Sequence, residues 1–588
     1  MNRKIMLAGI AALAFAGCEG KPEPAAAPDY SAELNSIADD YLDAVLDLSP
    51  FSVVYAGLSD VVDENLAAIE DNSPEGLARL QAVEDRLLAR LETIDVSSLS
   101  VRADWVLYET LKESLEASRD MRVCKTNLWG VNHMSGWQNA FPQVADAQPV
   151  ETPVERAEAL ARWRRLPAYL EQERANLDAG LAAGYSAPKR VVARVIAQLD
   201  AIIAAPPQQS PFLVFAQKAK GDKTFDAAIG KLAAEDIAPA IATFRDYLRD
   251  SYMPMARDDL SISAVPNGEQ CYEAMLRQYH TAKIGAKATF DRGQQAVAVN
   301  RASVIDRGQA MFGETDLAVI LARTKSEPSN RFRSEQELVE FTRALAPIAR
   351  EKIAPFFSRL PDQDLIVEPF PDFLKGTGQS SRYEPKPAAE GAATYRINTD
   401  DWETQTRGEA EIVLVHEGWP GHHLQIATAY SIDGLHPITR LLASTAYVEG
   451  WARYSEGLAE EAGLYESGYG AISRRAWPAR GMVVDPGLHL YGWTNEEAKA
   501  FLIESGRFDE KTADIALDRI AVIPGQLTAY DTGGLEIAAL RAEAVKRLGQ
   551  RFDVQAFHDR ILENGAVPLA ALRQHVEAWI VAEEERTQ

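Results

Sequence analysis

Three of the nine histidines lie in one eight-residue stretch, HEGWPGHH, which runs from His416 to His423. Apolar residues precede and follow it, so we expect His416 and Glu417 to lie on a mostly buried helix. Zinc peptidases with an HExxH motif use two histidines one helical turn apart to bind the metal, and the glutamate after the first serves as general base toward the water that the metal activates. The stretch therefore predicts a zinc site that performs hydrolysis.

The second histidine comes too late for a regular helix. His422 follows His416 by six positions and His423 follows it by seven, where an uninterrupted helix requires four. Seven residues advance a helix by roughly 10 Å, which is too far for one tetrahedral ion. Pro420 and two glycines favour a break, because proline cannot donate to the helical ladder and glycine lowers the cost of a bulge.

We expect two residues of this stretch to loop out. His422 then becomes the second metal ligand. His423 lies nearby, where it either supports a ligand residue or contacts the substrate. His423 as the ligand is one alternative. Histidines that only pack or cap at a helix end are the other.

A third ligand is expected from the next long helical segment, 444–456. Glu449 lies there among apolar residues, and a buried carboxylate is costly unless a cation accompanies it. Three protein ligands leave an open position for water, as in catalytic zinc sites. Glu456 returns to the same helical face and is expected to hold the other nitrogen of a ligand histidine; an ordinary solvated glutamate is the alternative.

Four segments in this order resemble a bacterial family known as domain of unknown function 885: HEGWPGHHLQ, AYVEGWARYSE, DPGLHLYGWT and IPGQLTAY. The family resembles zinc metallopeptidases and is mostly secreted or lipid-anchored. More distantly, the arrangement is similar to that of helical zinc peptidases such as thimet oligopeptidase and angiotensin-converting enzyme. The resemblance implies a mainly α, multi-helix, clamshell-like body with a small β element beside the active-site helix. The longer spacing between the histidines is where this sequence departs from them.

The resemblance also implies a histidine and a tyrosine downstream of the glutamate ligand that stabilise the oxyanion. By chain order these are His489 and Tyr530. His489 follows the expected turn 485–487, and Tyr530 lies on a helix expected after the turn 523–526. Structural roles in joining two loops are the alternative for both residues.

Residues 392–398, AATYRIN, alternate in the manner of a strand just before the metal helix. Enzymes of the resembled type keep an edge strand there, which pairs with the substrate backbone. We therefore expect Tyr395, Arg396 and Asn398 to bind substrate, and the alternative is that the polar residues only face solvent.

Residues 1–17 have a basic start, a short apolar run and small residues before Cys18, as in a secretory signal peptide. The sequence around Cys18 resembles the lipobox of bacterial lipoproteins, in which this cysteine is acylated. A signal peptide with an incidental cysteine is the alternative. Residues 18–29 then form the anchor and a flexible tether. We expect the protein at the bacterial cell envelope, facing the periplasm and touching the membrane only through its lipid.

The rest of the chain predicts an N-terminal helical region, 30–260, and a catalytic helical region, 261–588. No later stretch has the about 20 apolar residues of a spanning helix. The net charge of −25 argues against nucleic acid as a partner. A periplasmic location permits a disulfide between Cys124 and Cys271, but two buried free thiols are expected.

These observations predict a zinc-dependent peptidase that acts on peptides, with oligopeptides favoured. One alternative is a zinc hydrolase of another bond, such as an ester or a cell-wall amide. The other is a non-catalytic envelope lipoprotein with a vestigial metal site. The sequence leaves open the peptide sequence, the end preference and the oligomeric state.

Overall fold

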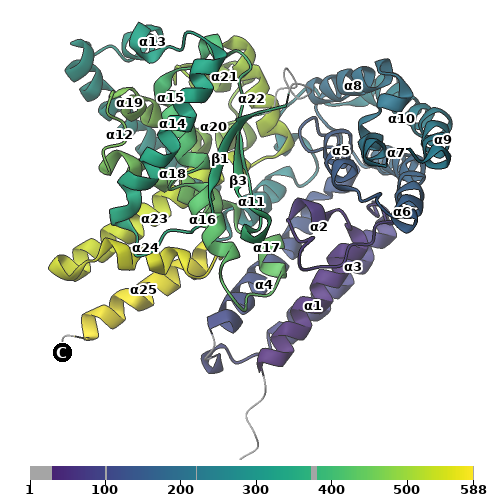
Figure 1. Cartoon of the computed structure of the whole chain (residues 1–588), viewed down its shortest axis with the longest axis horizontal. Coiled ribbons are helices and arrows are strands. Elements are labelled where there is room, and N and C mark those ends of the chain that lie inside the picture. The colour runs from purple at the N-terminus through teal and green to yellow at the C-terminus, as the bar shows by residue number, and fades with distance from the viewer. Residues whose placement is uncertain (1–29, 100–101, 220, 372–379, 587–588) are drawn as a thin grey trace, which may run out of the picture.

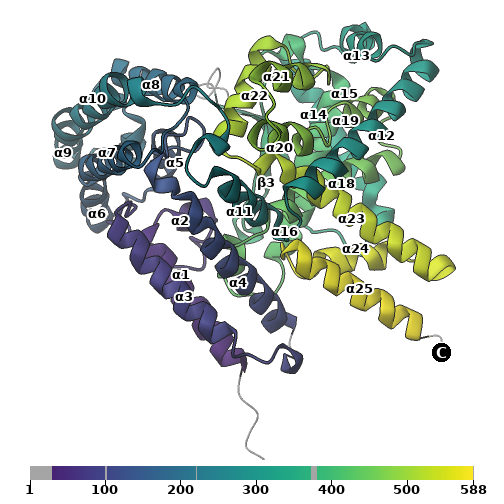
Figure 2. The same cartoon turned by 180° about the vertical axis from the view of Figure 1, so that it is seen from behind.

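The computed structural model describes residues 30–99, 102–219, 221–371 and 380–586. The expected signal peptide (residues 1–17), the expected tether (18–29) and Cys18 lie outside these residues. Figures 1 and 2 show helices α5 to α10 on one side of the molecule and most of the C-terminal helices on the other, with α1, α3 and α4 running below the first group. Within the described residues, no helix combines the length and the apolar character needed to cross a membrane.

The N-terminal region is built from helices, as expected. Its helices are α1 Tyr30–Leu48, α2 Ser52–Tyr55, α3 Pro74–Leu91, α4 Arg102–Met121, α5 Trp137–Ala147, α6 Pro153–Trp163, α7 Leu166–Ala182, α8 Lys189–Ala204, α9 Lys223–Lys231 and α10 Ala238–Tyr247. Pro167 lies in the first turn of α7, where its missing N–H costs no helical bond.

The C-terminal region is also mainly helical. Its helices are α11 Gly268–His280, α12 Ala286–Phe312, α13 Leu317–Ser326, α14 Glu335–Ile353, α15 Arg407–Glu417, α16 His422–Tyr430, α17 Ile438–Leu441, α18 Thr445–Glu461, α19 Tyr469–Ala476, α20 Gly481–His489, α21 Asn495–Ile503, α22 Glu510–Val522, α23 Gln526–Leu548, α24 Val554–Leu562 and α25 Leu569–Glu585. One apolar cluster joins α15, α16 and α18 with α23 to α25. Another cluster lies wholly between Phe51 and Ala256. The boundary at residue 260 stays a prediction.

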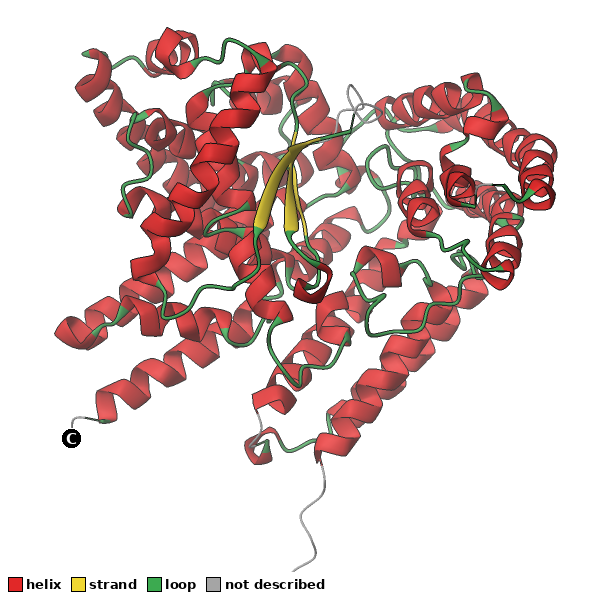
Figure 3. Cartoon of the chain, viewed as in Figure 1, coloured by secondary structure: helices red, strands yellow, loops and turns green. Residues whose placement is uncertain are grey.

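A small sheet lies among these helices (Figure 3). It comprises β1 Leu365–Pro369, β2 Arg382–Glu384 and β3 Ala393–Ile397, in the order β1-β3-β2. Apolar residues of β1 and β3 pack against Ala410 and Leu414 of α15. The mainly α fold with a small β element beside the metal helix is thus confirmed.

The strand predicted over 392–398 is present as β3, but it is not an edge. β3 pairs in parallel with β1 and antiparallel with β2, so both of its edges are occupied. The prediction that this strand offers an edge to the substrate is therefore wrong. The sequence did not reveal the short strands that flank it, because β2 has only three residues.

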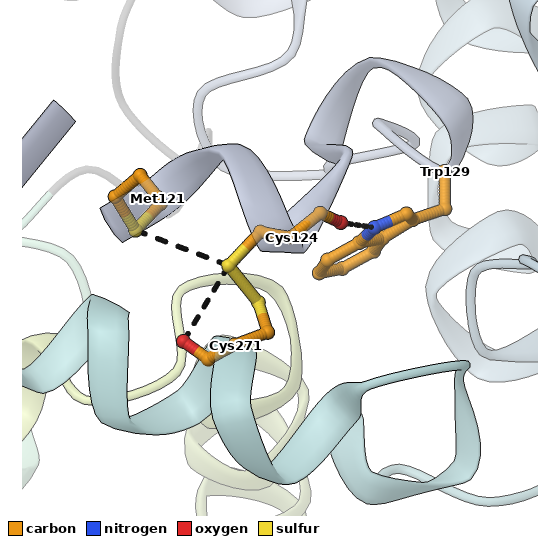
Figure 4. The surroundings of a disulfide bond; sticks show 4 residues. All are labelled: Met121, Cys124, Trp129 and Cys271. Atoms are coloured by element: carbon orange, nitrogen blue, oxygen red, sulfur yellow. Dashed lines mark hydrogen bonds between the residues drawn. A yellow bond between two sulfur atoms is a disulfide. The ribbon is translucent and has the colours of Figure 1, made fainter. Parts of the chain in front are cut away.

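Cys124 and Cys271 form a disulfide, with their Cα atoms 4.7 Å apart (Figure 4). The expectation of two free thiols is wrong. Cys124 follows α4 and Cys271 lies in α11, and both belong to one apolar cluster around Trp129. This packing brings together two cysteines 147 residues apart, a proximity that sequence alone did not predict.

The disulfide gives a testable expectation for thiol counting. Denatured without reductant, the protein should expose at most the Cys18 thiol, and reduction should release two more. Replacing both cysteines by alanine should reduce the free energy of unfolding by about 2–5 kcal/mol, because a long loop is no longer closed in the unfolded chain. Thiol titration and thermal unfolding measure these effects. Two additional free thiols in the unreduced protein would contradict the structure.

Candidate metal centre

The helix that carries His416 ends one residue later. Thr406 caps its start by accepting a hydrogen bond from the Glu409 N–H, and α15 then runs to Glu417. The four residues 418–421 are not helical, and α16 begins at His422. A straight helix could not bring both histidines to one ion. The helix is broken between them, as expected. We expected two residues to loop out of one continuous helix. The structure has four non-helical residues that separate two helices.

Two features hold this break in place. A Cβ atom at Gly421 would lie 2.0 Å from the His416 carbonyl oxygen, so only glycine permits the chain to pass so closely. The Pro420 carbonyl oxygen accepts hydrogen bonds from Trp451 Nε1 at 2.8 Å and from the Ser455 hydroxyl at 3.2 Å. Because both donors lie on α18, the helix that carries Glu449 also fixes the connection between the two histidines.

His416, His422 and Glu449 converge on one point. Glu449 Oε2 lies 3.3 Å from His416 Nε2 and 3.4 Å from His422 Nε2. All three ligand atoms lie within 4.8 Å of one another, and this is the one such group of three found within the described residues. On a tetrahedral zinc with bonds of about 2.0–2.1 Å, two ligand atoms are about 3.4 Å apart.

The chemistry of these atoms also fits a cation. Glu449 Oε2 is buried and has no aligned hydrogen-bond donor among the described residues, although both imidazoles are close. Burial opposes ionisation of Glu449, but contacts with the two histidines outweigh it and hold the pKa of the carboxyl well below its usual range. The three residues therefore fit a zinc ion, with two nitrogen ligands and one oxygen ligand.

Glu456 holds the other side of the first histidine. Its carboxylate accepts a hydrogen bond from His416 Nδ1 at 3.1 Å and from Arg453 Nη1 at 2.8 Å, and the residue is 1% exposed. Arg453 is in turn 3.3 Å from Asp531. Burial alone would lower the pKa of His416, but contacts with Glu449 and Glu456 raise it to about 10. The expected position of Glu456 behind a metal-binding histidine agrees with these contacts.

His423 lies outside this group. It is fully buried, its Nε2–H donates to the Gln363 carbonyl at 3.0 Å, and its Nδ1 accepts from the Tyr383 hydroxyl at 3.2 Å. The Trp419 ring packs against it edge-on at 4.5 Å between ring centres. Both nitrogens are thus used by the protein, and the geometry favours His422 as the second ligand.

Glu417 is positioned by the sheet. One of its carboxylate oxygens accepts a hydrogen bond from the Tyr383 N–H of β2 at 2.8 Å. Within the described residues β2 pairs only with β3, so this N–H lies on the outer side of the three-stranded sheet. The sheet thus holds the glutamate that follows the first histidine.

Tyr530 lies against the candidate metal ligands from the side of α23. Its ring stacks on His416 with 6.1 Å between centres. Helices α18 and α23 approach closely at Gly450 and Gly533, where a Cβ on Gly533 would lie 1.7 Å from the Ala446 carbonyl oxygen. Burial and the Glu449 carboxylate raise the pKa of Tyr530, so its hydroxyl stays protonated at neutral pH. The structure thus places the expected tyrosine beside the cluster.

His489 lies outside the group of candidate metal ligands. Its Nδ1 accepts from the Ile262 N–H and its Nε2–H donates to the Ile520 carbonyl, both at 3.1 Å, and the residue is fully buried. None of its described contacts is with a residue of the metal cluster. The expected turn before it is also wrong: residues 485–487 lie inside α20, a helix buried along its whole length. His489 therefore joins three segments of the fold, and we no longer assign it to the oxyanion.

The three residues expected to bind substrate have structural contacts. Tyr395 is 1% exposed and packs in the core under the sheet. Arg396 forms ion pairs with Glu368 at 2.7 Å and Glu384 at 2.9 Å. The Asn398 side chain accepts a hydrogen bond from the Asp400 N–H at 2.6 Å. These contacts hold the sheet and its connection to α15, so the expected substrate contacts are not supported.

Other residues at the site were not found from the sequence. They are Tyr383, whose N–H binds Glu417, Arg453, which binds Glu456, and Arg519, whose Nη2 lies 3.3 Å from the Tyr530 hydroxyl. Arg453 follows Glu449 by four positions, and this spacing on one helical face could have indicated it. Tyr383 and Arg519 reach the site through tertiary packing, for which no sequence signal was available.

The neutral His489 ring gives an expectation for acid stability. Burial lowers its pKa to about 3 from an ordinary value near 6.5. Its contribution is complete above pH 6.5 and is lost as pH falls toward 3, because the unfolded chain takes up the proton first. His489→Gln should therefore lose less stability than the wild type between pH 7 and pH 5, by an amount on the order of 1–2 kcal/mol. Denaturant unfolding at each pH measures the slope, and equal slopes would contradict this account.

Comparison with solved structures shows the same fold elsewhere. A candidate lipoprotein from Colwellia psychrerythraea matches with a TM-score of 0.85 and 23% identity, over 94% of this chain and all of the other. A candidate lipoprotein of unknown function from Shewanella oneidensis matches with a TM-score of 0.75 and 19% identity, over 92% of this chain and 99% of the other.

Comparison of sequences gives one short match and one long one. Metalloprotease slr0863 from Synechocystis sp. (strain ATCC 27184 / PCC 6803 / Kazusa) is 32% identical over 83 residues, which are 14% of this chain and 18% of that protein. The chain thus spans less than a fifth of the length of this relative. The model of a family described as bacterial protein of unknown function (DUF885) matches residues 50–576. The chain therefore belongs to the DUF885 family.

Proposed function

We propose that this protein is a zinc-dependent peptidase held at the bacterial cell envelope by a lipid. The observation that carries the proposal is the convergence of His416 Nε2, His422 Nε2 and Glu449 Oε2, at distances that suit one tetrahedral ion. Glu417 directly follows the first of these ligands, which is the order found in HExxH peptidases. Three protein ligands leave a further position for water or substrate, as hydrolysis requires.

When bound, zinc would lower the pKa of a coordinated water and polarise the scissile carbonyl. The protein supplies the remaining groups. Glu417 takes a proton from the attacking water and passes it to the leaving amine, as a general base and then a general acid. The Tyr383 N–H keeps one carboxylate oxygen in place, so the other is left to act on the water.

Tyr530 is assigned to the oxyanion. Its hydroxyl is protonated at neutral pH and lies on a ring that stacks on His416. A hydrogen bond to the negative charge that develops on the substrate carbonyl oxygen would stabilise the transition state. With His489 excluded by its buried contacts, Tyr530 is the member of the expected pair that retains this role.

Peptides are the substrate class that the comparisons favour, because the short match is to a protein called a metalloprotease. A nucleic acid is not expected as the substrate, because a chain with a net charge of −25 repels its phosphates.

The proposed cellular location is supported by the N-terminal sequence and by the structural relatives. Both solved structures are of candidate lipoproteins. Acylation of Cys18 would leave the described body outside the bilayer, joined to it by the tether of residues 18–29. We place the catalytic body on the periplasmic side.

The role of Glu417 predicts a separation of metal binding from turnover. Glu417→Gln should keep its zinc content, because residue 417 is not among the ligands, and should reduce kcat by about 10²–10⁴-fold through loss of the base. Elemental analysis and peptide hydrolysis measure the two effects. Glu411→Gln, a change at another glutamate of α15 that is only 6% exposed, serves as the matched control. Full activity in Glu417→Gln would remove this residue from the mechanism.

A further inference from the structure

Two guanidinium groups lie beside the ring of Tyr530. The guanidinium of Arg453 is 5.8 Å from the ring centre and that of Arg519 is 6.0 Å from it. Arg453 pairs with Glu456 and Asp531, so its charge is compensated. Arg519 forms no ion pair within the part of the chain that the structure describes. Of the two groups, it is therefore the one whose charge is left to act on the tyrosine.

The Arg519 side chain donates to neutral acceptors. Its Nη2 donates to Gln526 Oε1 at 2.7 Å and to the Tyr530 hydroxyl oxygen at 3.3 Å. Gln526 and Tyr530 lie four residues apart on α23, so they share one face of that helix, whereas Arg519 lies on α22. One guanidinium thus contacts two side chains that are one helical turn apart.

The turn between α22 and α23 is fixed by a third helix. Asp485 of α20 is fully buried, and its Oδ1 accepts from the Gly525 N–H at 2.9 Å and from the Tyr272 hydroxyl at 2.7 Å. Gly525 has a φ of 84°, a left-handed conformation that favours glycine, and it directly precedes Gln526, the first residue of α23. The start of α23 is therefore held in place, and Arg519 meets acceptors whose positions are fixed.

Helix α22 is also fixed on another side. Asp518, the residue before Arg519, has a side chain that is 1% exposed and forms ion pairs with Arg190, at 3.1 Å, and with Arg194, both on α8. Consecutive residues of a helix point about 100° apart, so Asp518 contacts α8 while Arg519 contacts α23. The packing against α8 thus gives Arg519 a defined position beside Tyr530.

The contact with Arg519 decides how the Tyr530 hydroxyl can donate. A hydroxyl has one hydrogen and two lone pairs that accept. When a guanidinium donates to the oxygen, the hydrogen must point elsewhere, and the charged donor makes the O–H a stronger donor in turn. The hydrogen therefore points away from the guanidinium of α22, on a ring that stacks on the candidate ligand His416.

We propose that Arg519 is a positioning residue, which turns the hydrogen of the Tyr530 hydroxyl toward the oxyanion and strengthens the hydrogen bond that this hydroxyl donates. The inference rests on the proposed peptidase function and adds to it a residue that acts only through Tyr530. It also gives a reason for an arginine without an acidic partner beside the site, because a carboxylate bound to Arg519 would weaken its pull on the tyrosine oxygen.

Single and double variants of the zinc-loaded protein test this role. Tyr530→Phe should reduce kcat by about 10²–10³-fold with KM little changed, because the donor to the oxyanion is lost. Arg519→Gln should reduce kcat by about 10–10²-fold, also with KM little changed, because the donor remains but is no longer oriented. In the Tyr530→Phe background, Arg519→Gln should change kcat by less than about twofold, since its effect requires the hydroxyl.

The double variant distinguishes positioning from a general structural role. A structural role would give losses that multiply, and either this result or a wild-type kcat in Arg519→Gln would overturn the proposal. Zinc content and thermal unfolding are measured for each variant. If Arg519→Gln does not fold, Arg519→Lys replaces it: this variant keeps the charge but loses the planar fork, so it should show the same coupling to Tyr530 with a smaller fall in kcat.

Arg190→Gln is the matched control. Arg190 contacts the same helix, at Asp514 and Asp518, but its described contacts do not include Gln526 or Tyr530. Its loss removes the same charge beside α22 and should leave kcat within about twofold of the wild type. A fall in kcat equal to that of Arg519→Gln would reveal a general effect on α22 and would contradict the proposal.

A binding measurement separates this inference from the peptidase proposal. A phosphinic peptide carries a tetrahedral, negatively charged group in place of the scissile amide and so resembles the oxyanion state. Measured by calorimetry, the zinc-loaded wild type should bind it about 10–10²-fold more tightly than Arg519→Gln does, and this difference should vanish in the Tyr530→Phe background.

The two possible failures then have different results. If the wild type hydrolyses no peptide but shows the coupled difference in binding, the proposed function fails and the role of Arg519 stands. If the wild type hydrolyses peptides and Tyr530→Phe is impaired, but Arg519→Gln binds the phosphinic peptide as tightly as the wild type, only the role of Arg519 fails.

Discussion

Two histidines six positions apart in the chain must reach the same point in space, and the rest of the site depends on the break that permits this. An intact helix would turn His422 away from His416. Gly421 permits the break, because a Cβ atom at this position would lie only 2.0 Å from the His416 carbonyl oxygen. Helix α18 then fixes the break by two hydrogen bonds to the Pro420 carbonyl. One helix thus supplies the third candidate ligand and controls the spacing of the other two.

The buried charges of the site form a continuous series. Glu449 faces two histidines, Glu456 faces His416 and Arg453, and Arg453 faces Asp531. Each charge would be costly alone in this interior, because water cannot solvate it. The arrangement leaves most of the carboxylates with a cationic partner, and it keeps the His416 ring in a fixed orientation.

The part of the site predicted from the sequence came from residues close to one another in the chain. The spacing of His416, His422 and Glu449 was informative because helix geometry limits which side chains can share an ion. Glu456 was indicated by its return to the same face of α18. The mainly α fold followed from apolar periodicity, which is a local signal.

The parts that failed depend on packing between distant segments. His489 was chosen by its order in the chain, but its contacts are with Ile262 and Ile520, which no local pattern connects to it. β3 was recognised as a strand, but its central position in the sheet depends on β1 and β2, which pair with its two edges. The disulfide likewise depends on how α11 packs against the end of α4. Sequence patterns define elements, whereas these features depend on which elements meet.

The most direct test of the account is the zinc content of the purified protein and of two neighbouring variants, His422→Asn and His423→Asn, measured by elemental analysis after confirming their helical content. The account predicts about one zinc per chain in the wild type and in His423→Asn, and its loss in His422→Asn, since only His422 is turned toward Glu449. Loss of zinc from His423→Asn with retention in His422→Asn, or a wild type that binds no zinc, would contradict it.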